Sequence, residues 1–201
     1  MYENIAIIGM ACRFPQAENS EEFWLNISSG VDLVRDFPQS RIKELADATG
    51  STVTSDFARG GYLEVISYFE PEYFNISREE CKYIDPQQRL VLELVEEAIQ
   101  ASGCNPLKLP AQRTGVFMST CPNIYSMTIA GDLPMRVGNA SEAAIAGRVS
   151  YTFNFQGPSI AINTESSSAM VALHYACRSL QDGECPRRHP RRSWSRPESP
   201  S

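Results

Sequence analysis

The chain has 201 residues, of which 42% are hydrophobic and 21% are charged, so it is long enough for one globular domain with a sizeable core. Its net charge is −6, but residues 1–185 hold 23 acidic and 13 basic residues, whereas residues 186–201 hold five arginines and one glutamate. The acidic body argues against nucleic acid as a partner, and no apolar run approaches the roughly 20 residues of a membrane span.

The cysteines and the N-terminus indicate a cytoplasmic protein. Six scattered cysteines form no C-x-x-C pair, which favours reduced thiols over a disulfide framework. Only two histidines are available, so a zinc site is not expected. No basic region precedes a long apolar run at the N-terminus, so no secretory signal is expected. We expect neither a bound metal nor a tightly held organic cofactor.

The predicted elements begin with a buried strand at residues 4–9, a short apolar run between polar residues. A helix is predicted from Ser20, whose hydroxyl would cap it, to Gly30, which would end it. Residues 31–60 are polar and are predicted to be irregular surface structure. Three side chains of the helix are predicted to face the core: Phe23, Trp24 and Ile27.

The clearest helix signal lies at residues 86–102. Asp85 is a typical capping residue, Pro86 suits the first helical position, and Gly103 follows the last turn. The acidic residues of this helix are predicted to face water: Glu93, Glu96 and Glu97.

The second half of the chain is predicted to alternate strands and helices. A buried strand is expected at residues 115–118, followed by a long loop at 119–135. A helix of small residues begins at Ser141. A strand at residues 159–164 then leads directly into a helix at 166–182. This order favours an α/β fold.

The last sixteen residues differ in composition from the rest. Residues 186–201 consist almost wholly of Pro, Arg and Ser, a composition that cannot bury a core, so we expect disorder. We therefore predict one domain over residues 1–185, and we interpret the tail as a frameshifted or truncated end. A basic tail that binds RNA or an acidic partner is the less favoured reading.

The most informative stretch is residues 163–174, Asn-Thr-Glu-Ser-Ser-Ser-Ala-Met-Val-Ala-Leu-His. It resembles the motif Asp-Thr-Ala-Cys-Ser-Ser-Ser-Leu-Val-Ala-Leu-His of the β-ketoacyl synthase domains of modular type I polyketide synthases. By this resemblance Ser166 stands at the position of the catalytic cysteine. Glu165 stands in place of the alanine, and Asn163 in place of the aspartate.

Further blocks in the same order support the resemblance, which runs continuously over residues 4–185. They lie at residues 5–15, 60–63, 69–77, 85–90 and 147–151. The resemblance implies a thiolase-like fold of α-β-α-β-α layers, an α/β class, with only the N-terminal half present.

The resemblance also implies a function of polyketide or fatty-acid type. Members of the family transfer an acyl group from a carrier-protein thioester to the enzyme and then carry out a decarboxylative Claisen condensation. The implied partners are an acyl carrier protein, which carries the phosphopantetheine arm, and acyl and malonyl-type thioesters. The complete domain is expected to be a homodimer, with residues 141–165 near the interface.

Ser166 is the candidate catalytic residue, but a hydroxyl ionises far less readily than a thiol and needs an adjacent base. Glu165 is interpreted as an anion that stabilises the helix start rather than as that base. His174 is interpreted as a packing or hydrogen-bonding residue, and His189 lies in the tail. The two histidines and the lysine that the family uses all follow the nucleophile, and none of them is matched here.

Three functions remain open. The first is a ketosynthase domain that is inactive or non-elongating, because Ser166 replaces the nucleophile and the C-terminal half is missing. The second is a loading-module ketosynthase that only decarboxylates or serves as a scaffold. The third, a serine hydrolase using Ser166, is less favoured because the G-x-S-x-G nucleophile elbow is absent.

Overall fold

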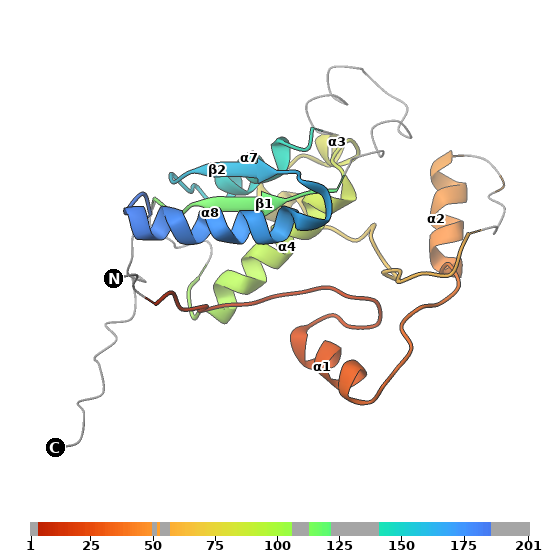
Figure 1. Ribbon diagram of the computed structural model, residues 1–201. Helices are drawn as coiled ribbons and strands as arrows, with labels where there is room; N and C mark the ends of the chain where they lie inside the picture. Colours follow the sequence, from red (N-terminus) through yellow and green to blue (C-terminus); the bar gives the residue numbers. More distant parts are fainter. Residues whose placement is uncertain (1–3, 50–51, 53–56, 106–112, 122–140, 186–201) are drawn as a thin grey trace. The chain divides into compact units, whose positions relative to one another are not determined.

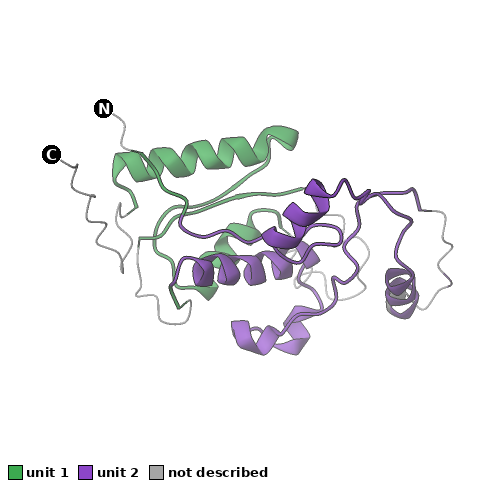
Figure 2. Ribbon diagram, turned by 90° about the horizontal axis from the view of Figure 1, so that it is seen from below, with its two compact units in different colours: residues 1–7, 104–201 green, residues 8–103 purple. Residues whose placement is uncertain are grey.

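The computed structural model describes residues 4–49, 52, 57–105, 113–121 and 141–185 (Figure 1). The chain divides into two compact units, one of residues 8–103 and one of residues 1–7 and 104–201 (Figure 2). The predicted tail at 186–201 and most of the predicted loop at 119–135 lie outside the described residues.

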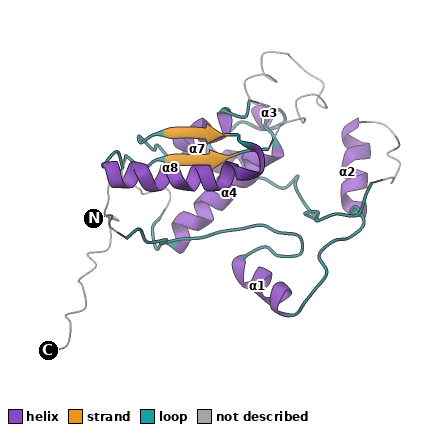
Figure 3. Ribbon diagram, viewed as in Figure 1, coloured by secondary structure: helices purple, strands orange, loops and turns teal. Residues whose placement is uncertain are grey.

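In the described part of the 8–103 unit, the regular elements are all helices, joined by loops (Figure 3). Its elements are α1 (Ser20–Ser28), α2 (Gln39–Thr49), the 3-10 turn η1 (Pro71–Phe74), α3 (Arg78–Cys81) and α4 (Pro86–Ala101). The prediction that residues 31–60 are irregular was wrong for α2. That helix begins just after Pro38, and Ile42 and Leu45 give it an apolar side at helical spacing.

The N-cap of helix α1 lies one residue before the predicted one. Asn19, not Ser20, is the N-cap, because its side-chain Oδ1 accepts hydrogen bonds from the backbone N–H groups of Glu21 and Glu22. The predicted end is confirmed by Gly30, whose φ is +65°. The predicted inward face was wrong in part. Only Phe23 packs, with its ring stacked 4.0 Å from that of Phe14, while Trp24 and Ile27 are 68% and 52% exposed.

The predicted strand at residues 4–9 is not formed. These residues have no strand partner within the described part of the chain, and Ile7 is 86% exposed. An apolar run becomes a strand only when a neighbouring strand accepts and donates its backbone hydrogen bonds. The run is apolar, as a strand requires, but the sequence pattern does not show whether another strand lies beside it.

Helix α4 follows its predicted bounds closely. The carboxylate of Asp85 accepts a 2.6 Å hydrogen bond from the N–H of Gln87, and Pro86 occupies the first position. Leu92 is completely buried. The buried apolar residues of this unit are Ala17, Phe74, Ile76, Ile84 and Leu92.

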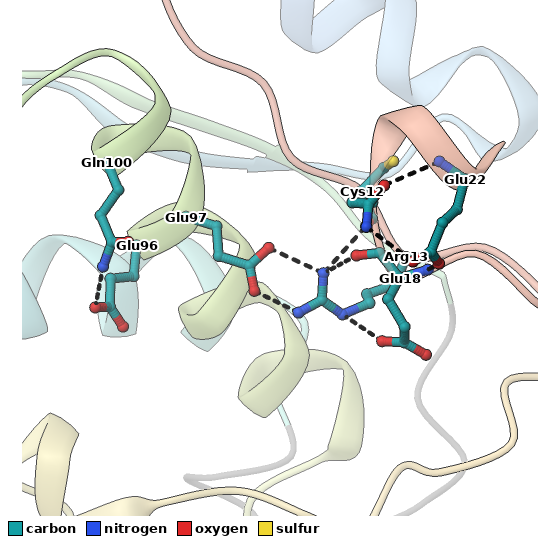
Figure 4. Close-up of polar contacts among 8 residues, drawn as sticks. Cys12, Arg13, Glu18, Glu22, Glu96, Glu97 and Gln100 are labelled. Atoms are coloured by element: carbon teal, nitrogen blue, oxygen red, sulfur yellow. Dashed lines mark hydrogen bonds and ion pairs between the residues drawn. The ribbon is translucent and has the colours of Figure 1, made fainter. Parts of the chain in front are cut away.

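The acidic residues of α4 do not simply face water, which corrects the prediction. Arg13 holds Glu97 with both terminal nitrogens of its guanidinium, one of them at 2.9 Å from Oε2, and its Nε lies 3.0 Å from Glu18 (Figure 4). The bond to Glu97 raises the pKa of Arg13 above its ordinary value. Glu96 accepts a 2.7 Å bond from the side chain of Gln100. The bonds between Arg13 and Glu97 join segments 84 residues apart, so no local pattern predicts them.

Glu93 makes the stability of this unit depend on pH. Burial raises the pKa of Glu93, so the folded state holds the proton more tightly than the unfolded state. The resulting penalty is absent below the unfolded pKa of about 4.3 and becomes full above the folded pKa. We expect Glu93→Gln to be more stable than the wild type at pH 7 in urea unfolding, with the difference vanishing towards pH 4. A larger gain at pH 4 than at pH 7 would contradict this.

The other unit contains a two-stranded parallel sheet. Its elements are β1 (Val116–Ser119), α7 (Ala144–Thr152), β2 (Ser159–Ile162), the 3-10 turn η3 (Glu165–Ser167) and α8 (Ser168–Asp182). The two strands pair so that Val116 of β1 lies opposite Ser159 of β2. The sheet lies between α7 and α8 (Figures 1 and 2). The buried apolar residues are Cys104, Val116, Ile145, Ala146, Val149, Phe153, Ala172 and Cys185.

The predicted elements of this unit are confirmed with shifted bounds. The strands at 115–118 and 159–164 correspond to β1 and β2, and the helix at 166–182 is α8 preceded by a short 3-10 turn. The close approach at Gly157 aligns the strands. Its N–H donates to the carbonyl of Thr114 at 3.0 Å, and a Cβ there would lie 2.6 Å from that carbonyl. Position 157, two residues before β2, therefore requires glycine.

Two glycines that lack close neighbours give opposite stability predictions. Gly147 lies inside α7, where an added Cβ meets nothing within 4 Å. We expect Gly147→Ala to raise the free energy of unfolding by about 0.5–1 kcal/mol, because alanine loses less backbone entropy in a helix. Gly183→Ala is the control. A Cβ at position 183 also meets nothing within 4 Å, but the backbone φ there is +77°. The substitution should therefore lower the free energy of unfolding by about 1 kcal/mol. Urea titration followed by circular dichroism measures both, and equal signs would contradict the argument.

Candidate functional site

A tight turn at residues 163–168 connects β2 to α8 and carries Ser166. Glu165 adopts the left-handed conformation, with φ +58°, which reverses the chain direction immediately before Ser166. Residues Glu165–Ser167 form the 3-10 turn, and the first α-helical residue is Ser168. Ser166 is exposed. The predicted arrangement of a strand, a sharp turn and a helix with the serine at its start is thus present.

The two serines after Ser166 are used to build the turn. The buried hydroxyl of Ser168 accepts a 2.7 Å bond from the N–H of Thr164 and donates a 2.7 Å bond to the carbonyl of Glu165. The hydroxyl of Ser167 donates to the carbonyl of Thr164 at 2.8 Å. Within the described part of the chain, the Ser166 hydroxyl makes no hydrogen bond. It is the one hydroxyl of the three that the turn leaves available for chemistry.

A second set of bonds holds the turn from its N-terminal side. The side-chain oxygen of Asn163 accepts a bond from the N–H of Glu165 at 3.2 Å. The side-chain NH₂ of the same residue donates to Oε2 of Glu142 at 2.8 Å. Glu142 was not predicted, since it lies 21 residues before Asn163 and no motif marks it.

The start of α8 favours negative charge near Ser166. The first N–H groups of a helix have no intrahelical acceptor, and the aligned peptide dipoles add a partial positive charge. An oxyanion or thiolate at position 166 would therefore be stabilised by about 0.3–1 kcal/mol at an exposed site. Glu165 places a carboxylate at the same helix end, as expected for an anion that stabilises the helix start.

No general base contacts Ser166 among residues 141–185. His174 is exposed, and its ring lies edge-on to that of the adjacent Tyr175, with the ring centres 5.7 Å apart. Glu165 forms no side-chain hydrogen bond to Ser166. His189 lies outside the described residues. The arrangement can therefore present a nucleophile and stabilise an anion, but it does not activate a hydroxyl.

Three further properties bear on the function. Over the described ranges, no group of three or more His, Cys, Asp or Glu side chains is arranged to hold a metal ion. The six cysteines, which all fall in these ranges, form no disulfide bond. None of the described helices has the length and apolar character needed to cross a bilayer.

The sequence is similar to a protein family and to proteins of known identity. The family model for the β-ketoacyl synthase N-terminal domain matches residues 2–186. The chain is 40% identical over 188 residues to the spectinabilin polyketide synthase system protein NorA' of Streptomyces orinoci. It is 39% identical over 192 residues to the pikromycin polyketide synthase component PikAII of Streptomyces venezuelae. Each alignment covers 91% of this chain and 5% of the relative, so the chain spans a small part of these proteins.

A solved structure shows the same fold. The oxazolomycin ketosynthase domain OzmH KS7 of Streptomyces albus matches with a TM-score of 0.74 at 34% identity. The match covers 89% of this chain and 32% of that chain. This likeness confirms the predicted α/β, thiolase-like fold, and the family match confirms that the chain corresponds to its N-terminal part.

Proposed function

Because this chain belongs to the β-ketoacyl synthase family of polyketide synthase ketosynthase domains, we propose that it acts on acyl thioesters, with Ser166 in the position that receives the acyl group. The observation that carries the proposal is the turn at residues 163–168. It uses the hydroxyls of Ser167 and Ser168 for its own hydrogen bonds and leaves Ser166 exposed at the start of α8.

The chain is proposed to be either inactive or non-elongating. A serine at the acyl-accepting position needs a base, and none contacts Ser166 within residues 141–185. A loading-module role, in which the domain decarboxylates or serves as a scaffold, fits the same observation. A serine hydrolase is the weaker alternative, because it needs the same missing base.

The proposed partners follow from the family. An acyl carrier protein would deliver acyl and malonyl-type thioesters on its phosphopantetheine arm, and this chain would bind no cofactor of its own. A homodimer near residues 141–165 is supported by β2. This strand pairs only with β1 in the described part of the chain, and Ile160 is 40% exposed. The absence of disulfide bonds among the cysteines supports a cytoplasmic location.

One experiment separates these functions. The full chain is incubated with an acyl-pantetheine and a malonyl-loaded carrier protein, and intact mass and CO₂ release are followed. An acyl adduct on Ser166 together with a condensed product would contradict the non-elongating proposal. CO₂ without condensation would support a decarboxylase, and neither signal would support an inactive domain or scaffold. Labelling of Ser166 by a fluorophosphonate, with turnover of a simple ester, would establish the hydrolase.

A further inference from the structure

We propose that Asn163 and Glu142 form a positioning pair that holds the 163–168 turn so that position 166 lies at the start of α8. This inference rests on the proposed function of that turn. Glu142 lies just before α7, and Asn163 directly follows β2. The pair therefore ties the turn to the element that packs against the sheet on the side away from α8.

The chemistry of the pair requires one amide and one carboxylate. The NH₂ of Asn163 donates to Glu142 at 2.8 Å, while its oxygen accepts from the N–H of Glu165 at 3.2 Å. One side-chain orientation satisfies both bonds, since the donor and acceptor are different atoms of the same amide. The bond to Glu142 is charge-assisted, so it is stronger than a neutral bond of the same length.

The second bond acts directly on the conformation of the turn. Glu165 is a non-glycine residue at φ +58°, a conformation that side chains disfavour. The hydrogen bond from the N–H of Glu165 to Asn163 helps to keep this reversal of the chain in place. It thereby sets the direction of the next residue, Ser166. Ser168 secures the two neighbouring peptides, because its hydroxyl accepts from the N–H of Thr164 and donates to the carbonyl of Glu165.

An aspartate at position 163 would conflict with Glu142. It could still accept from the N–H of Glu165, but it would place two carboxylates about 3 Å apart with no proton between them. Exchanging the two chemistries, with a carboxylate at 163 and an amide at 142, would restore a donor and an acceptor. The pair therefore predicts a specific non-additivity between Asn163→Asp and Glu142→Gln.

The test uses the full chain carrying Ser166→Cys, because the ionisation of the introduced thiol reports the local geometry without any turnover. The pH dependence of iodoacetamide alkylation is measured at that position by peptide mapping. The charged groups of the turn and of its contact partner are Glu165, which adjoins position 166, and Glu142, which bonds Asn163, while β1 and β2 carry none. Other titratable groups on the packed helices are Arg148, Tyr151, His174, Tyr175, Cys177, Arg178 and Asp182.

We expect Asn163→Asp to lower the alkylation rate at pH 7 by about tenfold, equivalent to a thiol pKa about one unit higher. Asn163→Ala, which adds no charge, should lower the rate by about threefold, because it removes both bonds. Glu142→Gln alone should change it by no more than about twofold, and the double change N163D/E142Q should return it to within about twofold of the parent.

The matched control is Ser150→Ala. It removes a 2.9 Å side-chain bond to Ser159, another exposed contact between α7 and β2 that does not touch the turn. It should leave the alkylation profile unchanged. The proposal would be overturned if N163D and E142Q had strictly additive effects on the alkylation rate. It would also be overturned if Ser150→Ala lowered that rate as much as they do. If the parent thiol itself showed no enhanced ionisation, the proposed role of the helix start would fail instead, so the two failures are distinguishable.

Discussion

Replacing Ser166 with cysteine is expected to make position 166 accept an acyl group at least about 100-fold faster than the wild-type hydroxyl. A free thiol has a pKa of about 8.5, and a helix start lowers it towards physiological pH. The exposed position at the start of α8 supplies that setting. The wild-type serine has no base to supply the same activation in the described part of the chain.

The measurement is the intact mass after incubation with an acyl-pantetheine, followed by peptide mapping. Mapping is necessary because the chain already contains six cysteines. Ser28→Cys is the matched control, since Ser28 is also exposed but lies at the last residue of α1, where the helix dipole disfavours a thiolate. A thiol at position 166 that reacts no faster than one at position 28 would contradict the assigned role of the helix start.

Gly9→Ala is expected to destabilise the 8–103 unit by about 3 kcal/mol, the largest stability effect that we predict. A Cβ on Gly9 would lie 2.1 Å from the carbonyl oxygen of Ala98 and 3.1 Å from the nitrogen of Ser102. Both are backbone atoms at the end of α4, so no side-chain rotation relieves the overlap. Either the 4–13 segment or the last turn of α4 must move.

Hydrogen exchange of the α4 amides, together with urea unfolding, measures this effect. The same chemical change at Gly147, where a Cβ meets nothing, serves as the control and should stabilise rather than destabilise. Unchanged exchange in α4 of the Gly9→Ala variant would show that the close approach of Gly9 to this helix is not required.

The amino-acid sequence by itself determined the features that depend on neighbouring residues. Asp85 and Pro86 marked the start of α4, because a cap and a first-turn proline act within a few residues. The short apolar runs before and after the small-residue helix predicted β1 and β2, because a few consecutive apolar residues bounded by turn residues favour a strand. The motif at residues 163–174 placed Ser166 after a strand and before a helix, which is where it lies.

Only the tertiary structure decided which distant groups meet. Asn163 bonds to Glu142 across 21 residues, and Arg13 bonds to Glu97 across 84. Residues 4–9 have the composition of a strand but no strand beside them in the described part of the chain, so they do not form one. Hydrogen-bond partners and burial are properties of the packed chain, whereas caps, turns and periodicity are properties of a few consecutive residues. The location of Ser166 could therefore be predicted from the sequence, and the contacts that hold its turn could not.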